Sequence, residues 1–144
     1  NILQLNDANY LIGSTDGYYI LKNIDFKFKF TVTNNVVNQL IKASTFTTDT
    51  NKIYIHTEQD SVMATLTDHQ RHNVDSYTQS VAKSYTGDPL VKELALSFET
   101  IRIISSIRFD TLDIRINPDL NVFLFQINIP AGGNIVIVSS GFVG

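Results

Sequence analysis

The chain has 144 residues, of which 43% are hydrophobic and 17% charged, and 11 Lys and Arg against 14 Asp and Glu give a net charge of -3. That length suits one globular domain with a fragment of a neighbour. The lack of Cys excludes disulfide frameworks, thiolate nucleophiles and sulfur-based zinc sites, and the acidic balance argues against a surface that is basic all over.

Apolar runs are only a few residues long, far short of the roughly 20 that span a bilayer. No charged segment followed by an apolar one marks a signal peptide. The sequence therefore predicts a soluble, cytoplasmic protein (in the host cytoplasm if viral) with no membrane partner. Because the chain starts at Asn1 rather than Met, we expect a fragment of a longer protein.

The first 25 residues predict a hairpin and a connector. Segments Asn9 to Ile12 and Tyr18 to Leu21 flank a Gly- and Ser-containing turn, which is typical of a loose hairpin. We expect residues 1–25 to be the final hairpin of a preceding domain plus a short connector, and residues 26–144 to form one further domain.

A period of two dominates the chain from Phe26 onward. From Phe26 to Thr33 aromatic and apolar residues alternate with Lys and Thr, which predicts a strand with one buried face. Similar patterns, separated by turn residues, predict strands at Lys52 to Glu58, Ser61 to Thr67, Tyr77 to Tyr85, Lys92 to Phe98, Leu112 to Asn117, Asn121 to Ile129 and Asn134 to Ser139.

Two segments have helical spacing instead. From Asn34 to Phe46 the apolar residues recur every three or four positions, after Thr33 and Asn34 as good N-caps. From Glu99 to Phe109 isoleucines recur every three residues. Isoleucine is a poor helix former, so this second helix depends on tertiary packing.

The order of elements occurs twice: strand, helix, then three strands. The repeat lies in the elements and not in residue identity. It predicts an α+β fold of two βαβββ units, with antiparallel sheet and two short helices together on one face.

This order resembles the DNA sliding clamps, the processivity-fold family that includes proliferating cell nuclear antigen and the T-even phage clamp. The segment Leu94 to Ile101 (LALSFETI) is similar to the strand-into-helix entry of the family's C-terminal domain, and the hairpin Asp7 to Leu21 looks like the end of the domain before it. The phage type, with three subunits per ring, is the nearer likeness. The resemblance implies a non-enzymatic processivity factor without cofactors, whose homo-oligomeric ring, preferably a trimer, encircles duplex DNA and tethers a DNA polymerase after loading by a clamp loader.

A clamp slides without reading sequence, so its inner helices need sparse basic groups that meet phosphates loosely. In the two helical segments Lys42, Arg102 and Arg108 outweigh Glu99, a net charge of +2 in a chain of -3. The DNA-facing residues implied are Asn35, Asn38, Gln39, Lys42, Arg102, Ser105, Ser106 and Arg108. An ordinary solvated helix face would account for the same residues.

The family also binds short partner peptides in an apolar pocket beside the interdomain connector. The resemblance implies that Ile24, Phe26, Phe28, Ile137, Val138 and Phe142 form this pocket. Any one of the strand residues would equally suit the core. The tyrosines and proline of eukaryotic clamps are replaced here by residues such as Val138 and Gly141, which leaves the partner motif open.

Catalytic and metal-binding patterns are weak. His69 and His72 lie in a predicted loop beside Asp68, where solvated side chains are the simpler interpretation. Asp110 and Asp113 suit a turn and a strand entry better than paired acid-base chemistry. Gly132-Gly133 joins two strands and precedes no helix, so no phosphate loop is expected. The sequence thus predicts neither an enzyme nor a metal site.

Two other classes of protein remain open. An all-β structural or binding module, of a phage virion or carbohydrate-binding type, would share the many strands and would require Glu99 to Phe109 to be extended. An enzyme using the His69 and His72 loop would require metal-dependent stabilisation. For a clamp, an outer strand should pair with the first domain of another chain.

Overall fold

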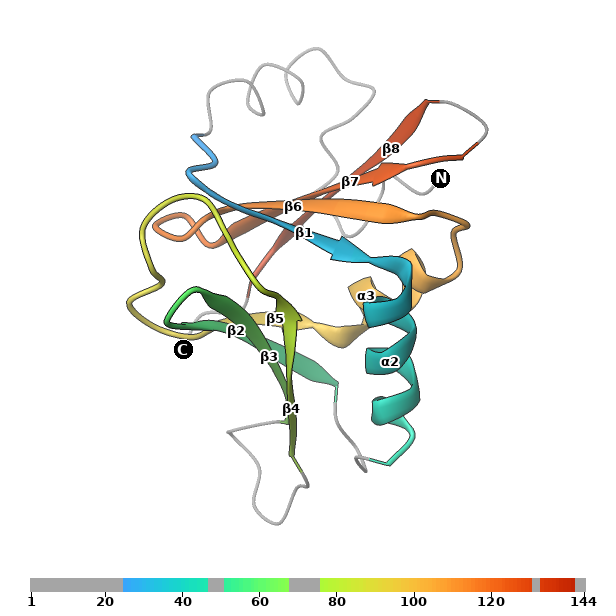
Figure 1. The fold of residues 1–144 in the computed structure, drawn as a ribbon, viewed down its shortest axis with the longest axis horizontal. Coiled ribbons are helices and arrows are strands. Elements are labelled where there is room, and N and C mark those ends of the chain that lie inside the picture. The colour runs from blue at the N-terminus through green and yellow to red at the C-terminus, as the bar shows by residue number, and fades with distance from the viewer. Residues whose placement is uncertain (1–24, 47–50, 68–75, 131–132, 142–144) are drawn as a thin grey trace.

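The computed structural model describes residues 25–46, 51–67, 76–130 and 133–141. Ten helices and strands are described in these ranges (Figure 1). They are β1 (Phe28–Thr33), α2 (Asn34–Ser44), β2 (Lys52–Glu58), β3 (Ser61–Leu66), β4 (Tyr77–Ala82), β5 (Leu94–Ser97), α3 (Phe98–Ser105), β6 (Thr111–Asn117), β7 (Val122–Asn128) and β8 (Asn134–Ser140). No described helix is long and apolar enough to cross a membrane.

The strands form two four-stranded sheets, in the orders β1-β6-β7-β8 and β4-β3-β2-β5. Every strand pair is antiparallel. Each βαβββ unit gives its first strand to the sheet of the other unit, because β1 pairs with β6 and β5 pairs with β2. The predicted α+β fold is therefore confirmed, with two sheets interlocked by exchange of their first strands.

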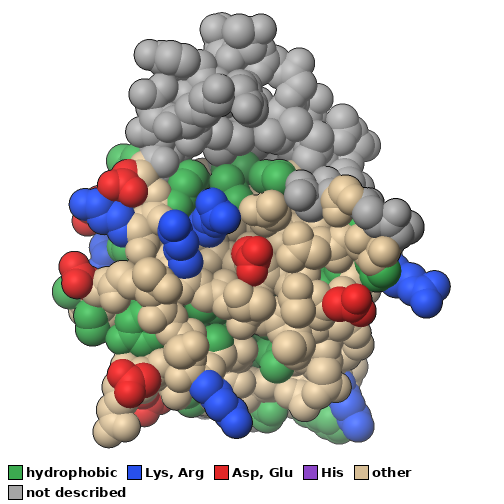
Figure 2. All heavy atoms as spheres, turned by 45° about the horizontal axis from the view of Figure 1, so that its top comes forward, with side chains coloured by type: hydrophobic (Ala, Val, Ile, Leu, Met, Phe, Trp, Pro, Cys, Tyr) green, Lys and Arg blue, Asp and Glu red, His purple; other side chains and the backbone are tan. Residues whose placement is uncertain are grey.

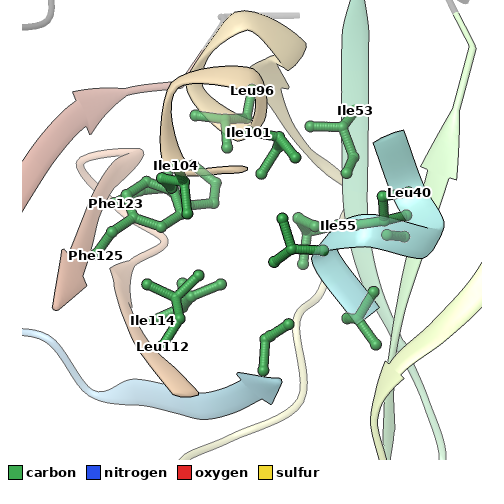
Figure 3. Close-up of a cluster of buried hydrophobic side chains, with 14 of the residues drawn as sticks. Leu40, Ile53, Ile55, Leu96, Ile101, Ile104, Leu112, Ile114, Phe123 and Phe125 are labelled. Carbon is green, nitrogen blue, oxygen red and sulfur yellow. The ribbon is translucent and has the colours of Figure 1, made fainter. Parts of the chain in front are cut away.

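The core lies between the two sheets and the two helices. Strand β1 alternates strictly between buried and exposed residues, and β6 and β7 repeat the alternation with a partly exposed outer face. Figure 3 shows Ile104 of α3 and Ile114 of β6 among the side chains that point toward a common interior with Phe123 and Phe125 of β7. Fully burying such a side chain stabilises the fold by about 1.5–3 kcal/mol.

Helix α2 begins where the sequence predicts it. The Thr33 hydroxyl caps it by accepting from the Val36 N–H at 3.3 Å. It ends at Ser44 and not at Phe46, because the Ser44 hydroxyl donates back to the Ile41 carbonyl at 2.6 Å and the Thr45 hydroxyl to the Lys42 carbonyl at 2.7 Å. Phe46 then lies outside the helix, 72% exposed.

Helix α3 is shorter than predicted and begins one residue earlier. Ser97 caps it through the Glu99 N–H at 3.3 Å. The hydroxyls of Ser105 and Ser106 donate to carbonyls three residues back, at 2.7 and 2.6 Å, and end the helix at Ser105. The predicted helical end at Phe109 was wrong, because Phe109 is buried in the core beyond the helix.

The predicted strands agree with the observed ones except at their ends. The largest difference is around β4, which ends at Ala82 instead of Tyr85. The chain then crosses to the other sheet, where Thr86 forms an isolated bridge with Lys29 of β1. Strand β5 likewise starts at Leu94 and not at Lys92, and β1 at Phe28 and not at Phe26. The predicted hairpin in residues 1–24 lies outside the described residues.

Candidate nucleic-acid interface

Helix α2 has an uncharged apolar face and a polar face with one cation. Val37, Leu40 and Ala43 are its buried residues, and the helix has no Asp or Glu. The four residues expected to face DNA are all exposed: Asn35, Asn38, Gln39 and Lys42. This face offers amide donors and one ammonium group without any carboxylate to repel a phosphate.

Two of these amides have partners within the protein. Asn38 donates to the Asn34 side chain at 2.9 Å, one turn earlier on the same helix. Gln79 of β4 donates to the Gln39 side chain at 3.0 Å, and so ties the helix to a sheet edge. Lys42 forms no ion pair with a described residue. The Lys42 ammonium group, the one cation of α2, is therefore not paired with a described carboxylate.

Helix α3 places its one acid beside its one cation. The Arg102 guanidinium lies 3.3 Å from Glu99 Oε1 and 4.9 Å from the centre of the Phe98 ring. Glu99 thus offsets the charge of Arg102, in an exposed pair of the kind that contributes at most about 1 kcal/mol. Ser105 and Ser106 use their hydroxyl hydrogens within the helix. Arg108 is exposed in the segment after α3.

The two helices contact each other and lie side by side (Figure 1). They come from different βαβββ units, so the exchange of first strands between the sheets brings them together. The exposed polar residues of α2 and α3, together with Arg108, are the candidate DNA-facing surface. Such a surface can attract a polyanion weakly and lacks the dense basic array that would hold it in place.

The residues expected to form a peptide pocket have different positions. Phe28 and Ile137 are core residues, 1% and 0% exposed, on strands at opposite edges of one sheet. Val138 lies on the other face of β8 from Ile137 and is 2% exposed. Phe26, which precedes β1, is partly exposed. Ile24 and Phe142 lie outside the described residues.

The other sequence candidates do not form a cluster. His56 Nε2 of β2 lies 3.3 Å from the Glu58 carboxylate, and Asp113 of β6 accepts from the Thr31 hydroxyl at 2.9 Å. Within the described ranges, no three His, Cys, Asp or Glu side chains are grouped to hold a metal ion. His69 and His72 fall in residues 68–75, outside the described part of the chain.

Two features were missed by sequence reasoning. Phe46 and Tyr77, 72% and 38% exposed, line one hollow between the end of α2 and the edge strand β4. Lys29 of β1 and Arg115 of β6 face each other across the pair of strands. The pairing of β1 with β6 could not be read from local patterns, since the two strands are far apart in the chain.

No protein-family model matches the sequence, and a search of curated proteins finds no matching relative. Solved structures with the same fold are found. The Helicobacter pylori beta clamp in complex with carprofen matches with a TM-score of 0.64 and 13% identity, over 92% of this chain and 36% of that one. The beta subunit of DNA polymerase III from Borrelia burgdorferi matches with a TM-score of 0.62 and 13% identity, over 92% of this chain and 35% of that one.

An archaeal structure gives a similar result. The PCNA2-PCNA3 complex from Sulfolobus tokodaii matches with a TM-score of 0.59 and 15% identity, over 83% of this chain and 48% of that one. The chain thus has the fold of sliding clamp domains, and it spans between a third and a half of the length of these clamps.

Proposed function

We propose that this chain is part of a sliding clamp subunit, which encircles duplex DNA and holds a polymerase on it. The main support is the match of its fold to clamp structures over 92% of the chain. The acid-free polar face of α2 beside α3 supports the DNA-facing role. The T-even phage subtype and the two-part division of the chain at residue 25 remain predictions.

The small number of cations on the two helices suits a protein that slides along DNA. A ring that encloses DNA is retained by its topology, so strong phosphate contacts would only hinder sliding. Lys42, Arg102 and Arg108 would each meet phosphates briefly, and the amides of Asn35, Asn38 and Gln39 would offer neutral donors. Ser105 and Ser106 would first have to give up the hydrogen bonds that their hydroxyls donate to backbone carbonyls. Such contacts to the sugar-phosphate backbone carry no sequence information. This function needs no bond-making group, metal or cofactor.

Ring closure would use β4. This strand has a partner on one side only, and half of its residues are exposed. Of the other sheet edges, β5 has only four residues and β1 is partly covered by its bridge to Thr86, while β8, with seven residues, is a second long edge. Unpaired N–H and C=O groups on a six-residue edge can extend the sheet into a second copy of the protein. Phe46 and Tyr77 would add apolar contact beside that edge.

Partner proteins would bind this chain through short peptide segments. One matching Helicobacter pylori beta clamp structure holds a DNA ligase peptide. By analogy, a polymerase and a clamp loader would present short segments to this chain near the predicted pocket. Since Phe28, Ile137 and Val138 are buried, Phe26 is the accessible residue of that pocket within the described ranges.

The DNA-facing role is tested by the variant K42A/R102A/R108A. We expect the variant to fold normally and to leave loaded circular DNA faster than the unchanged protein. For equilibrium binding to duplex DNA, the slope of log affinity against log salt should fall by up to about 3, at roughly 0.9 per phosphate contact. Retention is measured by gel filtration, and folding by circular dichroism.

The control is K27A/K92A, which removes two exposed cations from segments outside the helices. It should leave both retention and salt slope unchanged. If both variants weakened binding to duplex DNA equally for each charge removed, the helices would have no specific role in that binding. Loss of the folded state in the triple variant would contradict their placement on an open face.

A further inference from the structure

Two cations face each other on the side of β1 and β6 that points away from the core. Lys29 and Arg115 are direct cross-strand partners. On its other side Arg115 faces Leu124 of β7, so neither cross-strand neighbour of Arg115 is an acid. Like charges directly opposite each other destabilise a sheet. A bound anion between them would remove that cost.

The pair lines a cavity of about 390 Å³, together with Lys83 from the segment after β4. Thr31, Ser84 and Thr86 add hydroxyl groups to the lining. The one acid in the lining, Asp113, accepts a hydrogen bond from the Thr31 hydroxyl at 2.9 Å. None of the three cations forms an ion pair with a described residue. Figure 2 shows that one face of the molecule has several Lys and Arg side chains gathered at its upper left, with Asp and Glu side chains beside them.

The wall of the cavity is fixed by contacts between distant segments. Lys29 and Thr86 exchange both backbone hydrogen bonds, at 3.0 and 2.8 Å. Gly87 follows with φ of +105°, and a Cβ there would lie 2.4 Å from the Lys27 carbonyl oxygen, so only glycine allows this approach. The Tyr85 ring packs 5.0 Å from Phe28, and its hydroxyl donates to the Gln59 carbonyl at 3.0 Å.

We propose that this cavity binds the dianion of a phosphomonoester. Three cations and the hydroxyl groups of Ser84 and Thr86 around a compact space match the many acceptor oxygens of one tetrahedral phosphate better than a single carboxylate. Cross-strand Cβ atoms about 5 Å apart allow Lys29 and Arg115 to reach oxygens of the same group. None of the residues assigned to the DNA contact lines the cavity, so the proposal goes beyond that contact and does not depend on it.

The test is a titration of the full chain with inorganic phosphate at constant ionic strength, followed through the backbone amide signals of Thr86 and Arg115. We expect saturable shifts, and Arg115→Ala should weaken binding by about tenfold or more, because a charge-assisted contact is lost. Lys92→Ala, an exposed cation outside the cavity, should bind phosphate as the unchanged protein does. Shifts that never saturate, or equal weakening by Lys92→Ala, would overturn the proposal.

Stability gives a second readout. In chloride buffer Lys29→Gln should raise the unfolding midpoint, because the like-charge pair is removed. Phosphate should raise the midpoint of the unchanged protein by selective binding to the folded state, and should not raise that of Lys29→Gln. An equal effect of phosphate on both proteins would contradict the site.

Three ligands distinguish the source of the phosphate. Tighter binding of a phosphoserine peptide than of inorganic phosphate or a nucleoside monophosphate would assign the site to a phosphorylated protein partner. Tighter binding of the nucleotide would assign it to a small metabolite. A control peptide carries Asp in place of phosphoserine. If it bound as tightly as the phosphoserine peptide, the proposed specificity for phosphate would be wrong. A negative result in any of these phosphate-binding experiments would not bear on the proposed contact between the helices and DNA.

Discussion

Glu99 sets the positive charge that α3 offers to solvent. It occupies the first turn of the helix, where a carboxylate is favoured by the helix dipole, and its Oε1 lies 3.3 Å from Arg102. The same side chain therefore stabilises the helix end and offsets the charge of Arg102. A phosphate near α3 would have to compete with this carboxylate, which suits a contact that is brief.

Replacing Glu99 by Gln separates these two effects. We expect Glu99→Gln to strengthen duplex binding a few-fold at low salt, because Arg102 loses its local counter-charge. The free energy of unfolding should fall by less than about 1 kcal/mol, as the dipole contact and an exposed ion pair are lost. Binding is measured by fluorescence anisotropy and stability by urea unfolding. Glu58→Gln makes the same charge change on β2, and a similar gain from it would refute a local effect.

At the scale of elements, locally determined features were predictable and long-range ones were not. The bounds of β2 and the start of α2 at its Thr33 cap follow from residues close together in the chain. The end of α3 does not, because burial of Phe109 and back-bonding by Ser105 and Ser106 overrule the isoleucine spacing. The pairing of β1 with β6, and hence the Lys29 and Arg115 pair, depends on tertiary structure alone.

Edge strand β4 gives the prediction at this scale. Phe46→Asp should weaken association of subunits, because it replaces an exposed aromatic ring with a carboxylate in the hollow beside the edge that we propose for ring closure. The monomer should stay folded, since Phe46 is 72% exposed. Association is measured by sedimentation velocity. Val91→Asp places the same charge at a residue that is 97% exposed elsewhere. Equal dissociation by both variants would argue against β4 as the interface.

At the scale of the whole molecule, the exchange of first strands between the two βαβββ units interlocks the two sheets. The same exchange places helices α2 and α3 next to each other. The order of elements was sufficient to predict two units and adjacent helices. The alternation from Phe26 to Thr33 predicted a buried face that includes Phe28. It could not show that Ile137 and Val138 are both buried, because these neighbours lie on opposite faces of β8 and their burial depends on what covers each face. The DNA-facing residues stay a prediction, and the sequence count of their charge could not show that Arg102 lies 3.3 Å from the Glu99 carboxylate.

Retention on DNA should come from enclosure and not from affinity. This is tested by gel filtration of the assembled protein after loading onto nicked circular duplex, before and after one enzymatic cut of the circle. We predict that protein elutes with the circle and is released once the DNA is linear, at moderate salt that suppresses weak phosphate contacts. Equal retention on circular and linear DNA, or retention on neither, would contradict enclosure.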